Sequence, residues 1–157
     1  MSGSSTVGSN GIVPGVYDTL GTPSATSVPG NCINASSWTD SRGHLWLFEG
    51  NGFDANGAQG DLNDMWEFYP STREWTWMVD SSTESLLDYG LHGQAGVYGS
   101  IGTPAPGNIP SSRFAAVEWT DSGGNFWLFG GSGFDADGKD GFPDDLWEFN
   151  PSTNEWA

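Results

Sequence analysis

The stretch Asp145-Leu-Trp-Glu-Phe-Asn-Pro-Ser-Thr-Asn-Glu-Trp156 decides the fold of this chain. Its first half alternates as a half-buried strand does, and its last two residues begin a further strand. Between them lies a turn sequence, because proline presets φ and asparagine tolerates left-handed conformations. The same pattern stands 81 residues earlier as Asp64-Met-Trp-Glu-Phe-Tyr-Pro-Ser-Thr-Arg-Glu-Trp75. The sequence therefore predicts one strand-turn-strand unit twice.

The repetition covers most of the chain. Residues 15–76 align with residues 96–157 without a gap, and about half of the aligned residues are identical. A fixed period indicates a repeat architecture, in which each unit buries its apolar face only by stacking on a neighbour. We expect two units, residues 1–77 and residues 78–157, each with its N-terminal linker, and with the last strand of the second unit truncated.

Each unit is predicted to contain four short antiparallel strands. In the second unit these are residues 114–119, 125–129, 145–149 and a strand that begins at 155–156. The first unit completes its fourth strand at residues 74–78. Glycine and proline are too dense for helices, and four antiparallel strands per repeat describe a β-propeller blade. The expected fold is all-β, with two four-stranded blades.

The second repeat resembles the kelch repeat. Arg113 opens its first strand, Gly130 and Gly131 form a doublet after an aliphatic-aromatic strand, and Trp156 is the late tryptophan. The resemblance implies a four-stranded blade whose first strand is innermost, in a ring that typically has six or seven blades. No cofactor is expected, apart from a possible Ca²⁺ ion at the acidic loops.

The first repeat departs from this pattern at two positions. Cys32 stands where the second repeat has arginine, and Glu49-Gly50 replaces the glycine doublet. Gly50 and Trp75 are kept. About 45 residues of each repeat carry the resemblance. The remainder is mainly a long linker between the fourth strand of one unit and the first strand of the next.

Composition excludes several classes of partner. The net charge of −16 argues against nucleic acids and anionic membranes, both of which require basic surfaces. No apolar run is long enough for a membrane span, and Met1 does not lead into a signal peptide. The content of Gly, Ser, Thr and Asn, the scarcity of lysine and the sequon at Asn34 favour an extracellular or cell-surface location.

The most acidic loops suggest a metal site. Oxygen-rich loops with closely spaced Asp and Asn can bind Ca²⁺, although the spacing is not that of an EF-hand. The simpler interpretation is a turn in which these side chains bind their own backbone. The candidate calcium ligands are Asp135, Asp137 and Asp140 in the second repeat and Asp54, Asn56 and Asp61 in the first.

Nine tryptophans raise the possibility of a glycan-binding surface. Most lie at matched strand positions, which is typical of core residues. Trp38, Trp119 and Trp77 are the candidates for binding side chains. His44 and His92 have no counterpart in the other repeat, so a histidine-based catalytic or metal site within this chain is not expected. We expect no enzyme activity.

Assembly is expected to define the function. Two isolated blades would leave apolar faces uncovered, which forgoes on the order of 10 kcal/mol at about 25 cal/mol per Å². The leading hypothesis is a non-catalytic interaction or scaffold module that associates with itself, with three chains giving six blades. The alternatives are a carbohydrate-binding or cell-surface module, a fragment of a larger secreted enzyme, and an open filament.

Overall fold

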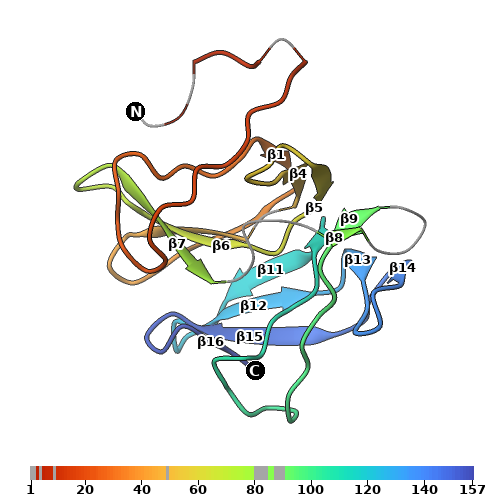
Figure 1. Ribbon diagram of the computed structural model, residues 1–157. Coiled ribbons are helices and arrows are strands. Elements are labelled where there is room, and N and C mark those ends of the chain that lie inside the picture. Colours follow the sequence, from red (N-terminus) through yellow and green to blue (C-terminus); the bar gives the residue numbers. More distant parts are fainter. Residues whose placement is uncertain (1–2, 4, 9, 49, 80–84, 87–90) are drawn as a thin grey trace.

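The computed structural model describes residues 3, 5–8, 10–48, 50–79, 85–86 and 91–157, and this part of the chain is all-β. Its arrangement is propeller-like, with four small and mostly antiparallel sheets (Figure 1). The strands are β1 (Cys32–Ile33), β2 (Ser36–Thr39), β3 (Leu45–Phe48), β4 (Asn51–Phe53), β5 (Gln59–Asp61), β6 (Met65–Tyr69), β7 (Glu74–Val79), β8 (Ser85–Leu86), β9 (His92–Gly93), β10 (Arg113–Phe114), β11 (Val117–Thr120), β12 (Phe126–Phe129), β13 (Ser132–Phe134), β14 (Asp140–Gly141), β15 (Leu146–Asn150) and β16 (Glu155–Trp156).

Two of the sheets are the expected four-stranded blades. The first blade has the order β2-β3-β6-β7 and the second the order β11-β12-β15-β16, with antiparallel neighbours throughout. Their registers agree, since Trp38 faces Trp46 in the first blade and Trp119 faces Trp127 in the second. The predicted all-β fold with two such blades is confirmed.

The sequence prediction of one continuous first strand per repeat was wrong. Ala115 has φ of 55° and separates β10 from β11, and Asn34 has φ of 54° at the matched position between β1 and β2. Left-handed backbone cannot continue a strand. The chain therefore turns at these residues, and β1 and β10 enter smaller sheets of their own.

Those smaller sheets contain hairpins that the sequence analysis treated as loops. One has the order β1-β4-β5-β9-β8 and the other β10-β13-β14. Gly52 and Gly133 lie at matched positions in them, where an added Cβ would meet the backbone oxygens of Asn31 and Ser112, just before β1 and β10, at 2.8 and 2.2 Å. Only glycine permits so close an approach.

The main core lies between the two blades. Trp38 stacks on Phe126 with 5.4 Å between ring centroids, and Phe48 meets Trp156 edge-on at 5.6 Å. The Nε1 of Trp38 donates a hydrogen bond of 3.2 Å to the backbone oxygen of Trp119. One face of the first blade thus packs on the opposite face of the second.

The long linkers cover the outer edge of each blade. Val16 and Val28 form a bridge in the first linker, as Val97 and Ile109 do in the second. The described residues contain no helix that is long and apolar enough to cross a membrane.

Candidate functional site

The second blade presents an uncovered apolar surface, here called the open face. It consists of Val117, Trp119, Trp127, Phe129 and Leu146. Trp119 is 42% exposed, Phe129 44% and Leu146 51%. The indoles of Trp119 and Trp127 are parallel to within 1°, with centroids 6.0 Å apart. Large exposed apolar patches on soluble proteins mark interaction surfaces.

The matched positions of the first blade are buried. Trp38 is 5% exposed, Phe48 1% and Met65 0%. They are covered by the second blade, which supplies Phe126 and Trp156 to this contact. The open face is therefore the same surface that the first blade uses to pack against its neighbour.

The first blade also has an uncovered surface, here called its outer face. It corresponds to the side of the second blade that packs against the first blade. Leu45 is exposed there, and Leu47, Phe68 and Trp75 are half-buried. Their counterparts in the second blade are fully buried against the first blade. Those counterparts are Phe126, Leu128, Phe149 and Trp156. The open face and the outer face thus correspond to the two surfaces that pack against each other between the blades.

The three candidate tryptophans have different surroundings. Trp38 is buried between the blades, Trp119 lies on the open face, and Trp77 is half-buried against Tyr17 with centroids 5.3 Å apart. Their role in binding stays a prediction. Trp38 has little exposed surface, because the second blade covers most of it.

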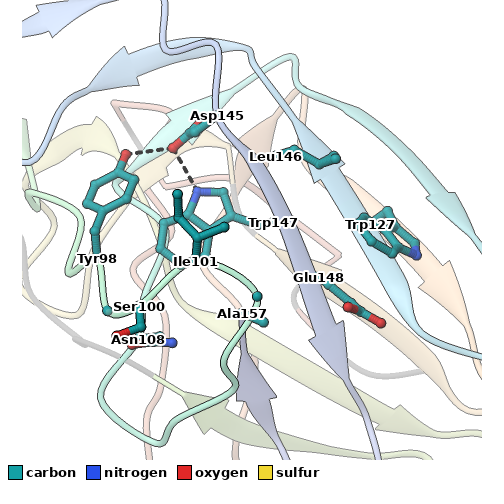
Figure 2. Close-up of a pocket in the computed structure, with 12 residues that line it drawn as sticks. Tyr98, Ser100, Ile101, Asn108, Trp127, Asp145, Leu146, Trp147, Glu148 and Ala157 are labelled. Carbon is teal, nitrogen blue, oxygen red and sulfur yellow. Dashed lines mark hydrogen bonds between the residues drawn. The ribbon is translucent and has the colours of Figure 1, made fainter.

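A pocket of about 510 Å³ lies at the outer edge of β15 (Figure 2). Tyr98 and Ile101 from the second linker form one wall, Trp147 forms the floor, and Ala157 lies beside it. The Tyr98 hydroxyl donates 2.6 Å to Asp145 Oδ2, and Trp147 Nε1 donates 2.7 Å to the same oxygen. Burial and the Asp145 carboxylate raise the pKa of Tyr98 to about 12. The walls are therefore fixed and mostly apolar.

Arg113 fixes the position of the Asp145 carboxylate. Its Nη1 and Nη2 donate to the two carboxylate oxygens at 2.6 and 2.8 Å, and Nη1 also donates to the Gly130 oxygen at 3.1 Å. Burial opposes ionisation of Asp145, but the hydrogen bonds and charge of Arg113 outweigh it and lower the pKa of this carboxyl group. The paired guanidinium joins the first strand of the repeat to the glycine doublet, and Gly130 and Gly131 have φ of 66° and 101°.

The first repeat lacks this cation. Cys32 occupies the arginine position, and the matching carboxyl group, Asp64, is fully buried. Tyr17 and Trp66 donate to Asp64 Oδ2, but Oδ1 has no hydrogen-bond partner among the described residues. Burial, with a smaller contribution from the charge of Asp54, raises the pKa of Asp64 to about 6.

The acidic loops form tight turns at the ends of the hairpins. Asp135 Oδ1 accepts 2.9 Å hydrogen bonds from the backbone N–H groups of Asp137 and Lys139. In the first repeat Asp54 Oδ1 accepts 2.8 Å bonds from the N–H groups of Asn56 and Ala58. These bonds occupy one oxygen of each carboxylate.

Asp61 and Asp140 come from different repeats but line one cavity of about 450 Å³. Burial raises the pKa of Asp61, and the charge of Asp140 adds to this. Within the described residues, the candidate ligands Asp135, Asp137 and Asp140 do not form a cluster of three acidic groups. Calcium binding by the acidic loops stays a prediction.

A polar cluster at the β2–β3 turn was not predicted from the sequence. His44 Nδ1 lies 2.6 Å from Glu67 Oε1, and Asp40 Oδ1 accepts the N–H groups of Arg42 and His44. Arg42 also donates to Glu67 at 3.1 Å. In the second repeat Asn125 replaces the histidine and donates 2.6 Å to Glu148. The matched contacts indicate that these side chains stabilise the turn in both repeats. An alignment of the two repeats would have predicted this role.

Comparison with known proteins supports the assignment of the repeat. The family model of the kelch motif matches residues 110–157, from just before β10 to the end of β16. The search of curated proteins gave no match.

Proposed function

We propose that this chain, whose residues 110–157 match the family model of the kelch motif, is a non-catalytic interaction and scaffold module of the kelch-repeat β-propeller type. It associates with further copies of itself through its blade faces. The observation that carries the proposal is the recurrence of both halves of the inter-blade contact on its two outward faces.

The contact is head-to-tail. The open face of the second blade corresponds to the surface of the first blade that is buried in the core, and the outer face of the first blade corresponds to the other half of that core. One chain can therefore add to the next by repeating the contact between its own blades. Heterologous contacts of this kind give a ring if the rotation closes and a filament if it does not. We propose a ring of three chains.

The area is sufficient for association. Four half-exposed large side chains on the open face offer roughly 100 Å² each. Covering about 400 Å² at about 25 cal/mol per Å² contributes on the order of 10 kcal/mol. This free energy is comparable to the cost of the translational and rotational freedom that two chains lose on association. The outer face of the partner chain buries a similar additional area. Side chains with low rotamer entropy, such as Trp119 and Phe129, lose little freedom on binding.

Two of the acidic side chains of the second blade are engaged in structural hydrogen bonds. Asp121 accepts the N–H groups of Gly123 and Asn125 and the Trp127 indole, and Asp145 is paired with Arg113. This use of the carboxylates supports a structural role for them and, with it, a non-catalytic module.

A glycan is the second candidate for the open face. The parallel indoles of Trp119 and Trp127 resemble a stacking platform for sugar rings. The matched pair in the first blade, Trp38 and Trp46, is covered by another blade instead. We favour a blade as the occupant of the open face for this reason.

The proposal can be tested by mixing two variants, each with a charge on one of the two faces. Phe129→Glu places a charge on the open face, and Leu45→Glu places one on the outer face of the first blade. Both side chains are 44% exposed, so the fold should tolerate the changes. By sedimentation equilibrium each variant alone should be a monomer, and an equimolar mixture should give a dimer through the two unblocked faces. A mixture that stays monomeric, or single variants that associate as the unmodified chain does, would refute association through these faces.

A further inference from the structure

One nitrogen and two carboxylate oxygens converge at the turn between β2 and β3. Asp40 follows β2 directly, His44 directly precedes β3, and Glu67 lies in the middle of β6 beside them. His44 Nδ1 lies 2.6 Å from Glu67 Oε1 and 3.8 Å from Asp40 Oδ2. The side chains of Asp40 and Glu67 are only 4% and 2% exposed. One potential ligand atom from each of the three residues lies within 4.8 Å of the other two.

The fold orients both carboxylates toward the imidazole. Asp40 Oδ1 accepts hydrogen bonds of 2.9 Å from the backbone N–H groups of Arg42 and His44. Glu67 Oε2 accepts a 2.7 Å hydrogen bond from the Tyr69 hydroxyl. Donors of this kind orient the ligands of a metal site and are part of its design. One oxygen of each carboxylate is thus held by the fold, and the other faces His44.

The turn itself does not require the imidazole. In the second repeat Asn125 stands in place of His44, and its Nδ2 donates to Asp121 at 3.3 Å and to Glu148 at 2.6 Å. A glycine there stands in place of Arg42. A neutral amide therefore completes the same turn. From the sequence no histidine-based site was expected, because His44 has no counterpart, but its partners come from its own repeat.

Arg42 is the counterion of the two carboxylates in the structure. Its Nη2 lies 2.6 Å from Asp40 Oδ2 and 3.1 Å from Glu67 Oε1. The Arg42 side chain is 55% exposed, and exposed ion pairs contribute little free energy. All three residues line a polar cavity of about 640 Å³ between the two repeats. The cavity gives the guanidinium room to move aside and gives water access to the carboxylates.

We propose that Asp40, His44 and Glu67 bind a Zn²⁺ ion, which displaces the guanidinium of Arg42 and takes a water molecule from the cavity as its fourth ligand. Zinc binds histidine nitrogen and carboxylate oxygen at about 2.0–2.2 Å, which places tetrahedral ligand atoms roughly 3.4 Å apart. The separations of 2.6 and 3.8 Å lie on either side of this value. A divalent ion also neutralises both carboxylates, whereas Arg42 supplies a single positive charge.

A Zn²⁺ titration of the full chain tests the proposal. The chain is first treated with a chelator and dialysed, and binding is then followed by isothermal titration calorimetry. We expect saturable binding at His44, and His44→Asn, which copies the second repeat, should weaken it at least about tenfold. The matched control is His92→Asn, which replaces the other histidine of the chain and should leave the affinity unchanged.

A second variant tests the displacement of the guanidinium and does not depend on a loss of binding. Arg42→Ala removes the competing cation and keeps all three ligands, so the dissociation constant should fall by about threefold or more. Circular dichroism checks that each variant is folded. The proposal is overturned by the absence of saturable Zn²⁺ binding, by equal affinities of His44→Asn and His92→Asn, or by an Arg42→Ala variant that binds no more tightly than the unmodified chain.

Discussion

Replacing Cys32 by arginine should convert a destabilising buried carboxyl group into an ion pair. Asp64 is fully buried, and burial raises its pKa to about 6 from 3.8. In the part of the chain that the structure describes, its Oδ1 has no hydrogen-bond partner. In the second repeat the matching Asp145 is paired by Arg113 at 2.6 and 2.8 Å, and its pKa is lowered. An arginine at position 32 would extend from the same point of the fold toward Asp64.

The magnitude follows from the raised pKa of Asp64. A difference of about two pKa units between the folded and unfolded chains corresponds to roughly 3 kcal/mol. Because the folded-state pKa is the higher one, the folded chain binds the proton more tightly, and the unfolding free energy falls as pH rises from about 4 to about 6. Above pH 6 the full cost of the buried charge is present.

The Cys32→Arg variant should reverse this dependence. Its guanidinium favours the ionised form of Asp64, so we expect a gain of about 2 kcal/mol at pH 8 after allowance for burying the new charge. In a chain of this length that gain raises the melting temperature by roughly 4–8 °C. At pH 4 the unmodified chain carries a largely protonated Asp64 and no buried charge, so the advantage of the variant should vanish.

Urea denaturation at pH 4, 6 and 8 measures these differences, with the protein concentration fixed because association changes apparent stability. The control is Asp64→Asn, which removes the ionisable group and should flatten the same part of the pH profile. If Cys32→Arg is no more stable than the unmodified chain at pH 8, or keeps its pH dependence between 4 and 6, the assigned role of Asp64 is wrong.

Three further substitutions test other parts of the account by thermal or urea unfolding. Arg113→Met should cost about 3–5 kcal/mol, because it leaves the carboxylate of Asp145 largely buried without its cation; a loss below about 1 kcal/mol would contradict this. Ala115→Gly should gain up to about 1 kcal/mol, since it relieves a φ of 55° that only glycine adopts without strain, and a loss of stability would refute that reasoning. His44→Asn should change stability by less than about 1 kcal/mol, because Asn125 makes the matching bond to its own glutamate, and a larger loss would show that the two turns are not equivalent.

The repeat period was the most informative feature of the sequence for predicting the fold. Matched motifs around Trp66 and Trp147 predicted strand-turn-strand units that the structure contains as β6–β7 and β15–β16. The break at Ala115 could not be predicted from that residue, because alanine has no preference for left-handed backbone.

Alignment of the two repeats also predicts part of the site. It does not predict which of the aligned residues are buried. The Cys32 for Arg113 replacement is visible in the sequence, whereas the burial of Asp64 is not. Nor does the sequence distinguish the exposed Trp119 from the buried Trp38, since identical residues at matched positions differ only in whether another blade covers them. Exposure of this kind depends on tertiary stacking, which local patterns do not encode.

The native mass of the unmodified chain tests the central claim most directly. Light scattering on a sizing column should give a discrete species of about three times the 16.7 kDa of one chain, and Phe129→Glu should reduce it to the mass of a monomer. A monomer of 16.7 kDa at all concentrations, with no effect of Phe129→Glu, would contradict association through the blade faces.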